Sequence, residues 1–181
     1  MLRGNSATTL FIDSARVMAR ADTRDARLEG LLEALAGHLE VASAAIFALR
    51  SPGGVLEQVA TLRLDDAAAA GLAAAVRNPA HPVARAATGD SSSFDVRPTA
   101  PGGPALRSHV PLVATRDGTL AVVGVLAVAH DVPVTPFARL LEAVGDLAAA
   151  TLRPGETRDM QLTRPRRGEA PDRPASGYFS M

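Results

Sequence analysis

Residues 120–129 constrain the fold of this chain more than any other segment, because none of them is charged or polar. Such a strand presents apolar side chains on both faces, so it must lie centrally in a sheet that is covered on both sides. Residues 107–115 form a candidate partner strand, and Asp117-Gly118 between the two is a strong hairpin-turn signal. The pattern predicts a hairpin whose second strand lies at the centre of a sheet.

Apolar residues at helical spacing predict three long helices. Residues 6–21 form an amphipathic pattern with Asn5 or Ser6 as the cap, and residues 25–41 carry one apolar stripe. The last helix begins at Thr135-Pro136, a cap followed by proline in the first turn, and ends at Pro154. The stripe of the second helix consists of Leu28, Leu31, Leu32, Leu35 and Leu39.

The stretch between the second helix and the hairpin predicts strands at residues 42–49 and 55–64 around a turn at residues 51–54. Asp65-Asp66 can cap an Ala-rich helix that ends before Pro79, and its small side chains suit close packing on a sheet. Pro82 and Gly89 bound a short helix, and residues 91–96 form a brief strand. The Pro- and Gly-rich segment 97–106 is a loop of the kind that often covers a binding site.

Together these elements predict an α+β fold with a central antiparallel sheet of five or six strands, a common sheet size. The first and last long helices should cover one face of the sheet, and the two middle helices should cover the other. Residues 154–181 lose all periodicity and are rich in Arg, Pro and charged residues, so we expect a disordered tail there. Residues 1–24 are an N-terminal amphipathic helix, and residues 25–153 are the folded domain.

Composition excludes several classes of function. The 19 basic residues are all Arg, they balance 19 acidic residues, and there is no Cys. The charge balance argues against nucleic acid and against a membrane surface as partners, and the lack of Cys excludes thiol catalysis and zinc–thiolate sites. Asp13 and Arg16 interrupt any signal-peptide core, and no apolar run is long enough to span a bilayer. We therefore expect a cytoplasmic protein.

The order of these elements resembles a GAF domain, the small PAS-like sensory module of bacterial signalling proteins. The resemblance covers residues 27–153 and depends on the turn from His81 to Gly89, on Val110-Pro111-Leu112-Val113, on Gly124-Val125-Leu126 and on the helix at 140–152. It implies a standalone GAF domain-containing protein. In that family the ligand cavity lies between the sheet and the middle helices, which would place His81, Arg85, Phe94 and His109 near a ligand.

Family members bind cyclic nucleotides, bilins, haem, metals or small metabolites, and three options fail in this chain. Bilin attachment and methionine sulfoxide reduction both use Cys, and the Asn-Lys-Phe-Asp-Glu motif associated with cyclic nucleotides is absent, as is Lys altogether. The cofactor therefore stays unknown. Arg85 suits an anionic ligand, but it suits a solvated position on a short helix equally well.

Other candidate sites favour structural interpretations. The four histidines lie in different elements without a paired spacing, so no metal site is expected. Ser108 beside His109, with Asp95 or Asp117, could suggest a nucleophile system, but adjacent strand residues point to opposite faces. His130 with Asp131 is expected at a polar turn that closes a strand, and no catalytic residue is predicted.

These observations predict a non-catalytic sensory domain that binds a small molecule or a signalling partner. The alternative is a structural homodimerisation module whose pocket is filled with side chains. In either case the helices at 6–21 and 135–152 are the expected homodimer surface. The tail, with Arg164, Arg166 and Arg167, is either a docking segment for a partner or a solvated extension.

Overall fold

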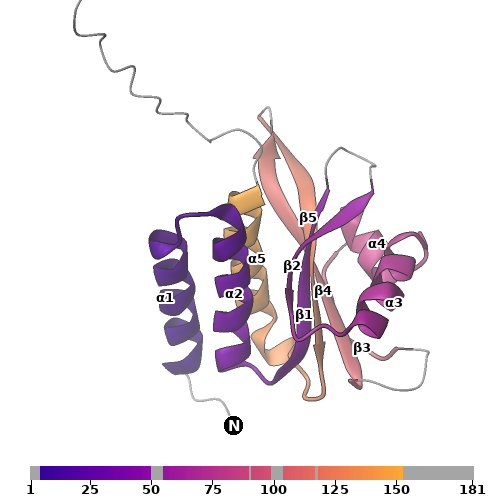
Figure 1. Cartoon of the computed structure of the whole chain (residues 1–181), viewed down its shortest axis with the longest axis horizontal. Helices are drawn as coiled ribbons and strands as arrows, with labels where there is room; N and C mark the ends of the chain where they lie inside the picture. The colour runs from indigo at the N-terminus through magenta and orange to yellow at the C-terminus, as the bar shows by residue number, and fades with distance from the viewer. Residues whose placement is uncertain (1–4, 50–54, 90, 99–103, 117, 153–181) are drawn as a thin grey trace, which may run out of the picture.

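A five-stranded antiparallel sheet in the order β2-β1-β5-β4-β3 forms the middle layer of the molecule, with helices on both faces (Figure 1). The computed structural model describes residues 5–49, 55–89, 91–98, 104–116 and 118–152. The strands are β1 (Val41–Leu49), β2 (Leu56–Leu62), β3 (Ser93–Val96), β4 (Leu106–Arg116) and β5 (Thr119–His130). The apolar strand β5 is central, which confirms the sequence prediction.

Three helices lie on one side of the sheet and two lie on the other, as predicted (Figure 1). On the first side, α2 (Arg24–His38) and α5 (Ala138–Leu152) contact the strands, and α1 (Asn5–Arg20) packs on α2 and α5. On the second side lie α3 (Asp66–Val76) and α4 (Pro82–Ala87). The fold is therefore α+β with a central antiparallel sheet. In the described residues, no helix combines the length and apolarity that a membrane span requires.

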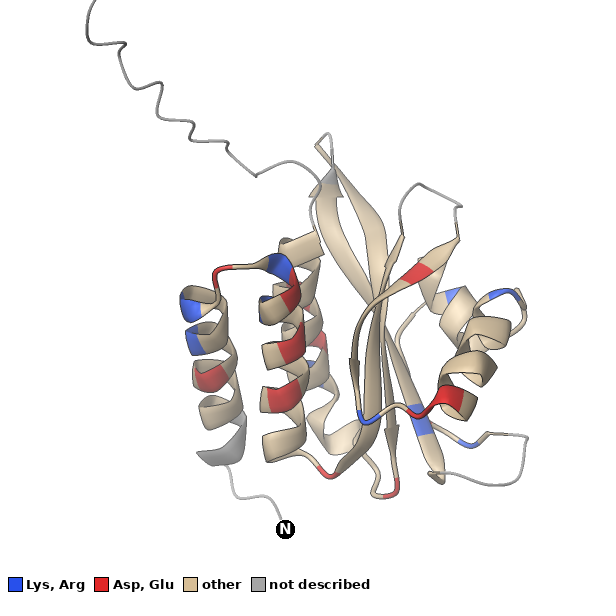
Figure 2. Cartoon of the chain, in the orientation of Figure 1, with Lys and Arg blue, Asp and Glu red and all other residues tan. Residues whose placement is uncertain are grey.

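The larger core lies between the sheet and the three-helix layer. The leucine stripe of α2 is buried there, together with Leu10 of α1 and Leu141 of α5. At Gly124 of β5, an added Cβ would lie 2.1 Å from the carbonyl oxygen of Phe47, so only glycine permits this approach of β5 to β1. Charged residues lie on the outer surfaces of the helices, where Arg16, Arg20, Glu29 and Glu33 are not buried (Figure 2).

The smaller core lies on the opposite face, between the sheet and α4. It consists of Ala45, Phe47, Leu56, Val83, Ala86, Val125 and Ala127. The prediction that the Ala-rich helix packs closely on the sheet is wrong, because α3 buries none of its residues. Only its half-buried Leu72, Ala75 and Val76 reach this core, so α3 covers it loosely.

Three local features differ from the sequence expectations. Helix α2 ends at His38 rather than residue 41, because Leu39 is already extended and β1 begins at Val41. The last helix begins with the 3-10 turn η1 (Thr135–Phe137), and Thr135 does not cap it; the N-cap is Val134, which makes no side-chain cap bond. The turn predicted at 51–54 and the tail predicted at 154–181 lie outside the described residues.

Candidate functional site

Two histidine rings meet on the face of the sheet that α4 covers. His81 is the N-cap of α4, where its Nδ1 accepts a hydrogen bond from the amide of Val83 at 3.3 Å. His109 projects from β4, and the two ring centroids are 5.9 Å apart in an edge-to-face arrangement. The His109 side chain is only 2% exposed, and its Nδ1 lies 3.2 Å from the hydroxyl of Ser93 on the neighbouring strand β3.

The two imidazoles are uncharged at neutral pH. Burial, together with smaller contributions from the nearby His81 and Arg107, lowers the pKa of His109 to about 4. Burial also lowers the pKa of His81. A neutral imidazole offers one donor and one acceptor nitrogen, so the pair can orient a ligand by hydrogen bonds without attracting it by charge.

The structure brings only some of the predicted site residues together. His81 and His109 touch, and Arg85 lies exposed on the last turn of α4, the helix that His81 caps. Phe94 lies apart from them, because it follows Ser93 on β3 and so faces the opposite side of the sheet, where it packs against the larger core.

A second polar cluster lies on the opposite face of the sheet, at the start of β4 and the end of β5. The hydroxyl of Ser108 is 2.9 Å from Nε2 of His130, and the backbone amide of Asp95 donates to the same hydroxyl at 3.1 Å. Both Ser108 and His130 are 0% exposed. The expectation that His130 lies in a polar turn is therefore wrong: β5 continues to His130 itself, and the residue is buried.

Sequence reasoning missed this cluster because its members are far apart in the chain. One signal was present: Ser108 alternates with the apolar residues Leu106 and Val110, and His130 alternates with Leu126 and Val128. A polar side chain on a buried face needs a hydrogen-bonding partner, and here Ser108 and His130 are partners of each other.

The Ser108–His130–Asp95 geometry is not that of a nucleophilic triad. In a triad the carboxylate orients the imidazole through Nδ1, but here Nδ1 of His130 lies 3.0 Å from the carbonyl oxygen of Val132. Asp95 instead lies 3.8 Å from Nε2, the nitrogen that Ser108 already occupies. Because Ser108 is fully buried, a substrate has no access to its hydroxyl in this conformation.

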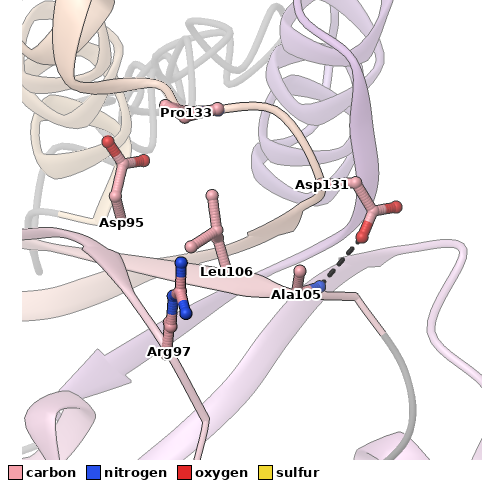
Figure 3. Close-up of a pocket in the computed structure, with 6 residues that line it drawn as sticks. All are labelled: Asp95, Arg97, Ala105, Leu106, Asp131 and Pro133. Atoms are coloured by element: carbon pink, nitrogen blue, oxygen red, sulfur yellow. Dashed lines mark hydrogen bonds between the residues drawn. The ribbon is translucent and has the colours of Figure 1, made fainter.

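Asp95 also lines a surface cleft of about 500 Å³ beside the cluster. Figure 3 shows Asp95, Arg97 and Asp131 arranged around Leu106, and the amide of Ala105 donates to Asp131 Oδ1 at 2.8 Å. The predicted loop 97–106 borders this cleft, although its residues 99–103 lie outside the described part of the chain. Within the described residues, no three His, Asp or Glu side chains converge as metal ligands would.

Solved structures with the same architecture include GAF domains. The chain matches the GAF domain of an Acinetobacter phosphoenolpyruvate-protein phosphotransferase with a TM-score of 0.63 and 12% identity, over 83% of this chain and 94% of that one. It matches the GAF domain assigned to a sensor histidine kinase of Pseudomonas syringae with a TM-score of 0.59 and 15% identity, over 82% and 87%. The fRMsr protein of Staphylococcus aureus, in complex with its substrate, matches with a TM-score of 0.59 and 13% identity, over 84% and 99%.

No family model and no curated protein matches the sequence itself. The similarity therefore lies in the fold, and the fold of this chain is that of a GAF domain. The resemblance inferred from the order of the elements is confirmed at that level.

Proposed function

We propose that this chain is a non-catalytic sensory domain of a cytoplasmic bacterial signalling system, with residues 25–153 as the sensory unit. The observation that carries the proposal is the contact between His81 and His109, which joins a helix cap to a buried strand residue. Two neutral imidazoles in contact, one buried and one partly buried, are suited to orienting a small molecule by hydrogen bonds. The similar fold of a domain assigned to a sensor kinase supports this choice.

Loosely packed α3 offers the route by which a ligand would enter. Because α3 buries none of its residues, displacing it exposes little of the smaller core and costs little free energy. The surroundings of the histidine pair are apolar, with Val83 and Ala86 buried on α4. The expected ligand is therefore a small, largely apolar molecule with one hydrogen-bonding group, and Arg85 at the edge could meet an anionic group on it.

The composition supports a non-catalytic role. The fRMsr structure shows that an enzyme can share this fold. The present chain contains no Cys, so thiol chemistry is not available to it. Ligand binding would instead change the population of conformations and alter the angle of the flanking helices.

Mass spectrometry tests the proposal directly. Protein purified gently from a bacterial cytosol is weighed under native and then denaturing conditions, and we expect a mass excess that disappears on denaturation. The variant His109→Phe should lose the excess, whereas His38→Gln, which alters a histidine on the three-helix side, should keep it. A native mass that equals the sequence mass, with no NMR shift at His109 when a cytosolic metabolite extract is added, would contradict ligand binding.

A second candidate, a homodimerisation module without a ligand, is favoured by two observations. The smaller core already contains Phe47 and Val125 beneath α4, and α1 exposes Phe11 and Ile12 to solvent at 48% and 43%. In this alternative the tail or the α1 and α5 surface would also meet a signalling partner. Analytical ultracentrifugation tests this second candidate, because a monomer would rule out the module, whereas the sensor is compatible with a monomer or a dimer.

A further inference from the structure

The start of the last helix is held by a carboxylate from a distant strand. The N-terminal amides of a helix have no partners within the helix, and a side chain at the N-cap usually accepts from them. Here Val134, at the N-cap of η1, makes no such bond. Asp95 of β3 takes that role: Oδ1 accepts from the amide of Val134 at 2.8 Å, and Oδ2 accepts from the amide of Thr135 at 3.1 Å and from the Thr135 hydroxyl.

The backbone of Asp95 is itself held by the buried cluster of Ser108 and His130. Asp95 has a backbone φ of +55°, a left-handed conformation that residues other than glycine rarely adopt. Its amide donates to Ser108, whose hydroxyl donates to Nε2 of His130, and Nδ1 of His130 donates to the carbonyl oxygen of Val132. The hydrogen bonds therefore run from β3 through β4 and β5 to Val132, two residues before the amide that Asp95 binds.

The directions of these bonds are those of a neutral His130. The Val132 carbonyl only accepts, so a proton lies on Nδ1, and in the neutral ring Nε2 then accepts from the Ser108 hydroxyl. A second proton on Nε2 would turn the Ser108 hydroxyl away from it. The charged groups near His130 are Asp95 on β3, Arg107 on β4 and Asp131 beside it, and burial, the largest effect, lowers the pKa of His130.

We propose that Asp95 is a latch that fixes the first turn of the last helix to the edge strand β3, so that movement of β3 is passed to α5. Within the part of the chain that the structure describes, strand β3 pairs only with β4 in the sheet, and α5 packs against α1 and α2. The latch therefore joins an edge of the sheet to the three-helix layer. Asp95 also lines the surface cleft, so a molecule bound there would reach the latch carboxylate. Only the biological use of the latch depends on the proposed sensory function, because the contact itself needs no ligand.

Amide hydrogen exchange measured by NMR tests the latch in the full chain. In Asp95→Asn the side chain keeps its size and tolerates the left-handed backbone, but one acceptor oxygen becomes a donor. We expect the amides of Val134 and Thr135 to exchange about tenfold faster or more, as expected for losing hydrogen bonds to a charged acceptor. The amides in the first turn of α5 should also exchange faster, while the amides of β5 and of α2 keep their wild-type exchange rates.

The matched control is Asp131→Asn, which alters the other carboxylate of the same cleft. Asp131 accepts from Ala105 and not from the start of the helix, so Val134 and Thr135 should exchange as in the wild type. Equal exchange rates in Asp95→Asn and the wild type, or equal acceleration in both variants, would overturn the latch.

A wild-type measurement keeps the proposal testable even if Asp95→Asn does not fold. Burial acts to raise the pKa of Asp95, but the bonds from Thr135 and Val134 outweigh it and leave that pKa below the ordinary aspartate value. On acidification, the amide shifts of Val134 and Thr135 should titrate together with the Asp95 carboxyl carbon. If the amide shifts of Val134 and Thr135 do not titrate with the Asp95 carboxyl carbon, the latch is refuted. Because neither experiment uses a ligand, a failed latch and a failed search for a ligand are separate results.

Discussion

The hydroxyl of Ser108 lies 2.9 Å from Nε2 of His130, and neither side chain is exposed to solvent. Strands β4 and β5 bring the two together from positions 22 residues apart, and the amide of Asp95 donates a second hydrogen bond to the Ser108 hydroxyl. A serine and a histidine so placed link three strands through buried hydrogen bonds. Their contribution is measurable as stability.

Replacing Ser108 by Ala should destabilise the fold. The change leaves Nε2 of His130 and the amide of Asp95 without a partner in a buried site, which costs about 1–3 kcal/mol of unfolding free energy. Urea denaturation followed by circular dichroism measures the loss. Thr61→Ala on the exposed side of β2 is the control and should change the unfolding free energy by no more than about 0.5 kcal/mol. Equal stabilities of Ser108→Ala and the wild type would show that the cluster contributes nothing.

Acidification should destabilise the protein between about pH 6.5 and pH 4. The folded-state pKa of His109 is lowered to about 4 from 6.5, so in this range the unfolded chain binds a proton that the folded chain does not. Unfolding free energy therefore falls as the pH falls, by up to about 3 kcal/mol from this residue, and the loss levels off below pH 4. His81 and His130 act in the same direction, since the pKa of each is also lowered.

Urea denaturation at a series of pH values measures this dependence. His109→Gln, which cannot titrate but can still bond to Ser93, should reduce the slope between pH 6.5 and pH 4. A slope in that variant as steep as in the wild type would assign the effect to other groups.

Gly124→Ala should disrupt the centre of the sheet. The new Cβ would lie 2.1 Å from the carbonyl oxygen of Phe47 and 2.9 Å from Cδ1 of Leu152, so β1, β5 and α5 cannot all keep their positions. We expect a loss of about 3 kcal/mol or more of unfolding free energy, or no folded protein.

Gly37→Ala is the matched control for that substitution. Gly37 lies in α2 with nothing within 4 Å of an added Cβ, so alanine there should stabilise the fold by about 0.5–1 kcal/mol. Thermal melts of both variants test the pair. A Gly124→Ala protein as stable as the wild type would contradict the register of β1 against β5.

If the chain forms a homodimer through its terminal helices, Phe11→Glu together with Ile12→Glu should convert it to a monomer. Both side chains lie exposed on α1, so the charges are tolerated in a monomer but not in a dry interface. Sedimentation velocity measures the change. Leu120→Glu, at a site on β5 that is 78% exposed, is the control and should leave the association unchanged. Loss of the dimer in the control, or its survival in the α1 variant, argues against this surface.

Local patterns predicted most of the fold. The leucine stripe of α2 is buried, Asp65 accepts from the amide of Ala68 as the cap of α3, and Pro82 begins α4. Each of these depends on residues within one or two turns of the chain, so neighbouring positions carry the whole signal. The GAF architecture followed from the order of such elements, and the solved structures with the same fold confirm it.

The candidate site was predicted only in part. His81 and His109 were expected near each other and lie in contact, while Phe94 was expected beside them and faces the other core. The pairing of Ser93 with His109 places Ser93 on the histidine side and so sends Phe94 to the opposite one. Strands β3 and β4 are separated by a loop, so the residues within either strand do not show how the two are paired.

The sequence by itself determined which segments are helices and strands, which strand is central and which face of α2 is buried, because hydropathy and periodicity act over a few neighbouring residues. Only the tertiary structure decided that Asp95 reaches the start of α5, that Ser108 meets His130 and that α3 covers its core loosely. These contacts depend on strand register and on helix placement, which are selected by the packing of the whole chain rather than by any segment of it.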